Sequence, residues 1–156
     1  MEDLIMKGSE AAIGLFSAME ERDFARAGGF LSDQLQVTGV APEPLSKSDF
    51  LNVHRALSSG IPDLKFHHRI FKEDGDRNGV KVSITGTHTK EMTPPVPGLR
   101  NIPATGKPIK MPQEEVYLTA REGKITKIEL KQTPGGGLRG LLKQIGVTLP
   151  EHAGVA

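Results

Sequence analysis

The hydrophobic residues of the first sixty positions recur every three to four residues, which is the period of a helix with one buried face. This spacing predicts a helix over residues 3–21. A shorter helix is expected over 23–29, where a glycine pair would end it, and an alternating segment at 34–40 predicts a strand. A third helix is predicted over 46–60, with a serine at 46 or 48 as its cap and a glycine at its end.

From Pro62 onward, hydrophobic and polar residues alternate, which is the period of a strand with one buried face. The alternation predicts four strands, at residues 63–71, 79–92, 107–120 and 124–132. Turn residues rich in Gly, Asn and Asp join the first strand to the second and the third to the fourth. We therefore expect two antiparallel hairpins.

Two segments do not follow this alternation. Residues 93–106 are dense in proline and glycine, and because proline lacks the amide donor that a sheet requires, a long loop is expected there. After three consecutive glycines the helical period returns, which predicts a short closing helix over 136–147. Residues 148–156 are expected to form a frayed tail.

Helices followed by consecutive antiparallel strands are typical of an α+β fold in which the helices pack on one face of the sheet. We expect mainly helical residues 1–60, an antiparallel sheet over 61–133, and a single domain over 1–156, because no repeat or linker is evident. Gly86 lies inside a predicted strand and is consistent with a bend that would curve the sheet. A curved sheet that helices cover incompletely encloses a pocket.

Composition narrows the possible functions. The chain has 156 residues, with 20 Lys and Arg against 19 Asp and Glu, and this near balance argues against binding to nucleic acid or to an acidic membrane surface. Because there is no cysteine, disulfides and thiolate catalysis are excluded. The chain shows neither a basic leader nor an apolar run of about 18 residues, so a cytoplasmic protein is expected.

Histidines in two predicted strands are candidates for chemistry. His88 follows Ile84 and Gly86 on one strand face and is expected to extend an apolar stripe. A neutral imidazole in that place could act as a general acid or base, or it could only satisfy a carbonyl at the end of the sheet. His68 shares the side of Phe66 and could face the same interior. No metal site is expected, because three or four convergent ligands are not evident.

Three further polar positions are candidates. Glu114 and Glu115 are adjacent in one strand and must point to opposite sides, and a buried glutamate would have a raised pKa and be a credible base. Of the two, Glu115 is taken as the candidate base. Tyr117, the only tyrosine, could donate a hydrogen bond to a developing oxyanion or simply pack. His54 lies on the apolar stripe of the third helix, which suggests a histidine at the core or at the rim of a pocket.

The chain also resembles a known family. The segments HRALSSGIPDLKF, TGTHT, IPATGK and GLLKQIG occur in the order and spacing of the SnoaL-like polyketide cyclases, part of the nuclear transport factor 2-like (ketosteroid-isomerase-like) superfamily. The resemblance extends over about residues 10–147 and implies a cone-shaped α+β fold, a deep apolar cavity between helices and sheet, and a homodimer built on the sheet. Family cyclases close a ring by an intramolecular aldol reaction, use a carboxylate base and need no cofactor.

The resemblance also implies which residues meet the ligand. His88 matches the histidine of the family's GTHT motif and is expected to line the cavity. We expect ligand contacts from Phe16, His54, Phe66, Ile84, Tyr117 and Gln132.

The sequence departs from the family at the position of the base. Members commonly carry an aspartate at the end of the last strand, whereas this chain has Gln132 and Thr133 there and no acid between residues 130 and 150. Neither side chain accepts a proton usefully at neutral pH. Two functions stay open. One is an enzyme acting on a small hydrophobic carbonyl compound through His88, His68 or Glu115. The other is a non-catalytic dimeric domain that binds a small apolar ligand.

Overall fold

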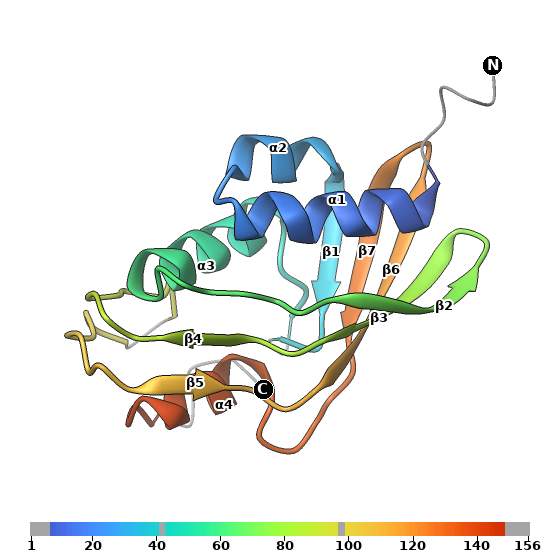
Figure 1. The fold of residues 1–156 in the computed structure, drawn as a ribbon. Helices are drawn as coiled ribbons and strands as arrows, with labels where there is room; N and C mark the ends of the chain where they lie inside the picture. Colours follow the sequence, from blue (N-terminus) through green and yellow to red (C-terminus); the bar gives the residue numbers. More distant parts are fainter. Residues whose placement is uncertain (1–6, 41–42, 97–98, 149–156) are drawn as a thin grey trace.

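The structure, a computed structural model, describes residues 7–40, 43–96 and 99–148. Helices come first and strands follow, in the expected order (Figure 1). The elements are α1 (Gly8–Glu20), α2 (Phe24–Gly29), β1 (Leu31–Thr38), α3 (Lys47–Gly60), β2 (Arg69–Asp74), β3 (Arg77–Val82), β4 (Thr85–Thr87), β5 (Pro108–Lys110), β6 (Glu114–Arg121), β7 (Lys124–Leu130) and α4 (Gly137–Gln144).

Five strands form the main sheet in the order β1-β7-β6-β3-β2, and β4 pairs with β5 in a second, smaller sheet. The pairs β2–β3, β3–β6 and β6–β7 run antiparallel, as the alternation after Pro62 predicts. Strand β1 runs parallel to β7, so the main sheet is mixed and not wholly antiparallel as expected. The predicted α+β fold, with amino-terminal helices against a sheet and a short closing helix, is confirmed.

The helices begin where side chains can satisfy their free amide groups. In α3 the Ser46 hydroxyl accepts a hydrogen bond from the Asp49 N–H at 3.1 Å, which selects Ser46 from the two predicted caps. In α2 the Asp23 carboxylate accepts from the Arg26 N–H at 3.0 Å. Helix α1 lies across the main sheet and contacts β3, β6 and β7 (Figure 1). Residues 3–6 of the predicted first helix lie outside the described residues.

Both predicted hairpins form at the glycine turns. The β6–β7 turn places Glu122 at φ 53° and Gly123 at φ 79°. Two consecutive positive φ angles match a type I′ turn, whose twist suits a two-residue hairpin. In the β2–β3 turn, Gly75 has φ 58°.

Two predicted strands are each divided in two. The segment 79–92 forms β3 and β4, and the segment 107–120 forms β5 and β6. Pro112 lies in the second break and offers no N–H to a ladder. At Gly86 the chain passes so close to α3 that an added Cβ would lie 2.3 Å from Cγ2 of Ile61. The strand therefore turns over the end of α3 and pairs away from the main sheet.

The closing helix α4 is fixed to β5 by one side chain. The Lys110 N–H donates to Oε1 of Gln144 at 2.8 Å, and Nε2 of Gln144 donates to the Lys110 carbonyl at 2.9 Å. The proline-rich segment between β4 and β5 is a loop, as predicted, although Met92 and Ile102 pair within it and are buried. The expected frayed tail lies outside the described residues from position 149 onward.

No helix in the described ranges combines the length and the apolar character that crossing a membrane would require.

Candidate functional site

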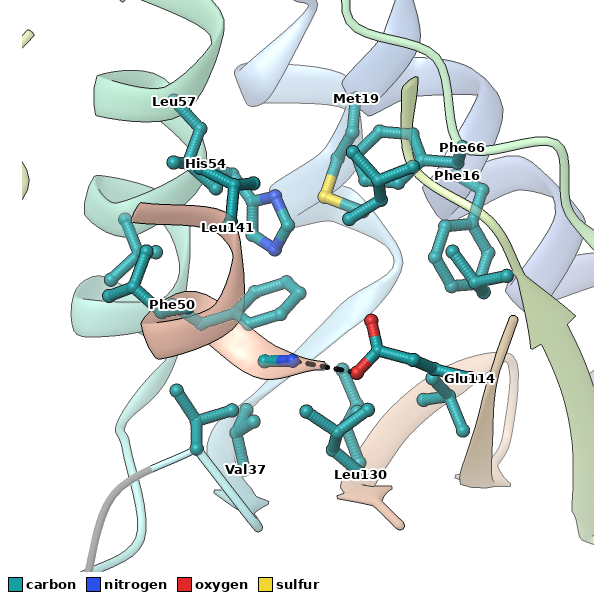
Figure 2. Close-up of a pocket in the computed structure, with 18 of the residues that line it drawn as sticks. Phe16, Met19, Val37, Phe50, His54, Leu57, Phe66, Glu114, Leu130 and Leu141 are labelled. Carbon is teal, nitrogen blue, oxygen red and sulfur yellow. Dashed lines mark hydrogen bonds between the residues drawn. The ribbon is translucent and has the colours of Figure 1, made fainter. Parts of the chain in front are cut away.

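A cavity of about 130 Å³ lies between the helices and the main sheet. It is lined by Leu15, Phe16, Met19, Val37, Val40, Leu45, Phe50, Val53, His54, Leu57, Phe66, Val82, Ile84, Met111, Glu114, Val116, Leu118, Ile128, Leu130, Gly137, Leu138 and Leu141. All of these residues are apolar except Glu114 and His54. The cavity thus has two titratable side chains in an otherwise apolar wall (Figure 2).

Glu114 lies at the start of β6 and points inward with Val116, Leu118 and Ala120, because alternate residues of a strand share one face. Its side chain reaches the beginning of α4, where Oε1 accepts a hydrogen bond from the Gly137 N–H at 2.8 Å. The second oxygen, Oε2, has no hydrogen-bond partner among the described residues and points toward the cavity (Figure 2). Glu114 is only 5% exposed.

The glycines before α4 make this approach possible. A Cβ at Gly136 would lie 2.4 Å from Oε1 of Glu114, so a side chain there would force the carboxylate to shift from this position. Burial raises the pKa of the Glu114 carboxyl, and the hydrogen bond from Gly137 lowers it by a smaller amount. Such a carboxyl is poised to exchange a proton with a bound molecule.

His54 comes from α3 and faces the cavity from a different wall than Glu114 (Figure 2). Its ring contacts Phe50 at 4.6 Å and Phe66 at 5.7 Å between ring centroids. Neither ring nitrogen has a hydrogen-bond partner in the described part of the chain, and Nδ1 is buried. Burial lowers the pKa of His54 to about 4, so the imidazole is neutral at pH 7.

Of the nine residues expected at the site, four line the cavity: Phe16, His54, Phe66 and Ile84. Gln132 does not line it; the side chain is exposed, and Nε2 donates to the Gly39 carbonyl at 2.9 Å. An acid does lie at the beginning of α4, because β6 brings Glu114 there.

His88 does not line the cavity, contrary to expectation. It is completely buried, and its Nδ1 lies 2.9 Å from the Thr105 hydroxyl and accepts from the Thr105 N–H at 3.3 Å. The backbone of His88 also bonds to Lys107 and Gly106. Because β3 ends at Val82 and β4 pairs with β5, the alternation that linked His88 to the apolar stripe is interrupted. His88 fixes the loop before β5.

Glu115 and Tyr117 lie on the sheet face opposite the cavity, again contrary to expectation. Oε2 of Glu115 forms an ion pair with Lys131 at 3.1 Å, and this pairing lowers the pKa of the carboxyl. Tyr117 packs against Phe71, with the Arg77 guanidinium 4.2 Å from its ring centroid. The inward side of β6 was visible in the sequence, since Val116, Leu118 and Ala120 share the parity of Glu114 and not of Glu115.

His68 is also not among the lining residues, although it lies beside them. Its ring stacks on Phe16 with centroids 5.2 Å apart. His67, just before it, has φ 46°, so the strand alternation begins only at Arg69. The three residues predicted to be catalytic, His68, His88 and Glu115, therefore do not line this cavity.

Among the described residues, no group of three or more His, Asp or Glu side chains could hold a metal ion.

Comparisons with known proteins bear on the fold and the family. IdmH, a proposed polyketide cyclase from Streptomyces antibioticus, has 21% identity and a TM-score of 0.68, with 91% of this chain and 100% of that chain covered. AclR, a proposed hydroxylase from Streptomyces galilaeus, has 18% identity and a TM-score of 0.69, with 89% and 95% covered. A proposed polyketide cyclase from Pseudomonas putida has 15% identity and a TM-score of 0.67, with 89% and 98% covered.

At these identities the solved structures show the fold alone, and one fold can support different chemistries. A search of curated proteins finds no match. The model of the SnoaL-like polyketide cyclases, however, matches residues 11–129, which is most of the chain. This protein belongs to the SnoaL-like polyketide cyclase family.

Proposed function

We propose that the protein catalyses cofactor-free proton transfer on a small hydrophobic carbonyl compound, with Glu114 as the base. The observation that supports this is a buried carboxylate with one oxygen fixed by Gly137 and the other free toward an apolar cavity. Exclusion of water strengthens the interaction of such a group with a bound substrate. The cyclisation or isomerisation of a ketone or ester would begin in this way.

In the proposed step, the C–H bond next to the carbonyl breaks and its proton passes to Oε2 of Glu114. The electron pair of that bond delocalises onto the carbonyl oxygen and gives an enolate. In an isomerisation, Glu114 returns the proton to another carbon. In a cyclisation, the enolate carbon attacks a second carbonyl of the same molecule, and the resulting alkoxide takes the proton. No oxidant, metal or cofactor enters the balance.

The proposal is tested by exchange of ketone α-protons for deuterium in D₂O, followed by proton NMR with a series from cyclohexanone to 2-tetralone. Because a base acts in its ionised form, the protein-dependent rate should rise with pH as Glu114 loses its proton, and then level off. The midpoint should lie above the ordinary carboxyl pKa of 4.5, since burial raises the pKa of this group. If ketones bind but their α-protons exchange no faster than in buffer alone, the protein is a non-catalytic binding domain instead.

We also propose that two copies associate through the face of the main sheet opposite the cavity, as the family resemblance implies. On this face Phe71 and Tyr117 form an aromatic pair, with ring centroids 6.0 Å apart, and Nζ of Lys81 lies 5.0 Å from the Phe71 centroid. Amphipathic aromatic residues with cationic neighbours are frequent in protein interfaces.

Light scattering after size exclusion should therefore give a dimer for the wild type and a monomer for Tyr117→Glu. Ile13→Glu is a suitable control, because Ile13 is 46% exposed on α1 and lies away from this face. A monomeric wild type, or dissociation caused only by the Ile13 substitution, would contradict the assignment of this face.

A further inference from the structure

We propose that the cavity selects a carbonyl compound of single-ring size, whose oxygen accepts a hydrogen bond from His54 while its acidic C–H faces Glu114. This inference rests on the proposed function, since it names the substrate class of the same cavity. It gives His54 a role in binding the substrate, which the proposal of Glu114 as the base does not include.

The position of His54 suggests a ligand because, of the four described side chains that have a buried nitrogen without a partner, it alone lines the cavity; the others are His68, Asn78 and His88. Both ring nitrogens lack a partner among the described residues, although Nδ1 is inaccessible to solvent. A buried polar group without a hydrogen bond is destabilising, and such groups are uncommon in folded proteins. Phe50 and Phe66 contact the ring and fix its orientation, so the fold holds it in place. A neutral imidazole has one N–H, which could donate to a carbonyl oxygen.

The two polar groups lie on separate walls, with apolar side chains between them. Glu114 comes from the sheet and His54 from α3, and Figure 2 shows both side chains directed into the same space. A ligand that interacts with both side chains must be largely apolar. It must also have a hydrogen-bond acceptor for His54 and an acidic C–H that faces Glu114. Removal of that proton would place negative charge on the oxygen that His54 holds.

The volume of the cavity limits the apolar body. At about 130 Å³, it is close to the size of an engineered cavity of about 150 Å³ that accepts benzene. Phe66 and Leu141 are 1% and 2% exposed and form part of the wall, so their packing leaves little freedom to widen it. A fused multi-ring molecule would need these side chains to move.

Three small molecules test the hydrogen bond to His54 and the size limit separately, in binding measurements by ligand-observed NMR. Cyclohexanone and methylcyclohexane have similar size, and only the first has the oxygen; 2-tetralone adds a second fused ring. The wild type should bind cyclohexanone roughly 3- to 10-fold more tightly than methylcyclohexane, which is the range for one hydrogen bond. In His54→Phe this preference should vanish while methylcyclohexane still binds. The ¹⁵N shifts of the His54 ring in the wild type should respond to cyclohexanone alone.

The size limit has its own matched pair of variants. Leu141 and Leu142 are both buried in α4, but only Leu141 lines the cavity. Leu141→Ala should therefore admit 2-tetralone, whereas the wild type and Leu142→Ala should not. Wild-type binding of 2-tetralone as tight as that of cyclohexanone would overturn the size limit, and an oxygen preference that survives in His54→Phe would overturn the role of His54. If binding follows both expectations but no α-proton exchange is detected, the proposed function is contradicted, whereas this inference is supported.

Discussion

Glu114→Gln is expected to reduce the rate of α-proton exchange by about 10² to 10⁴-fold, the range for loss of one general base. Glutamine has nearly the same shape, and its amide oxygen can still accept the hydrogen bond from Gly137. The geometry at the start of α4 should therefore persist while the proton acceptor is lost. Exchange is measured by proton NMR at saturating ketone and at a pH where the wild-type rate is constant.

The neighbouring residue provides the matched control. Glu115→Gln removes the same charge from the opposite face of β6, where the carboxylate pairs with Lys131 at 3.1 Å. Its exchange rate should stay within about twofold of the wild type, because surface ion pairs contribute little. Equal loss in both variants, or retained exchange in Glu114→Gln, would contradict the assignment of the base.

The same Glu114→Gln substitution should increase the free energy of unfolding at neutral pH. The folded-state pKa of Glu114 is raised above 4.5, so the folded protein holds this proton more tightly than the unfolded chain. Stability is therefore lost as pH rises from 4.5 through the folded pKa, and a neutral amide avoids that loss. The gain should be present at pH 7 and disappear in acid, as urea unfolding at several pH values would show.

Acid is expected to destabilise the fold through His54 and His88. The pKa of His54 falls from 6.5 to about 4 on folding because burial disfavours the charged ring. A lowered folded pKa means that its stabilising contribution is complete above pH 6.5 and is lost as pH falls toward 4. The shift corresponds to as much as about 3 kcal/mol of unfolding free energy. Burial also lowers the pKa of His88, which adds to the loss in the same direction.

Urea unfolding between pH 4.5 and 7.5 tests this expectation, with His54→Phe as the comparison. Phenylalanine retains an aromatic ring beside Phe50 and Phe66 but does not titrate, so the variant should lose less stability than the wild type on acidification. Glu114 acts in the opposite direction above pH 4.5, so Glu114→Gln should be steeper in acid than the wild type. The same slope in His54→Phe and wild type would show that folding does not lower the pKa of His54.

The period of a helix predicted the cavity lining more reliably than the alternation of a strand did, since Glu115 and Tyr117 lie in β6 on the face away from the cavity. Phe16 and His54 belong to helical stripes, and the period of a helix places them on the inner side. His88 and His68 were misplaced because each lies beyond an interruption, at the end of β3 or beside the positive φ of His67. One change of pairing or one left-handed residue alters the side to which every later residue points.

The sequence by itself determined the order of helices and strands, both hairpins and the closing helix, because periodicity, glycine turns and caps act between residues that are close along the chain. Only the tertiary structure decided that β1 pairs parallel to β7 and that β4 leaves the main sheet to pair with β5. It also decided that Glu114, and not a residue of the last strand, supplies the acid at the start of α4, 23 positions away. These features depend on how distant segments share one core, and local patterns of side chains do not specify that packing.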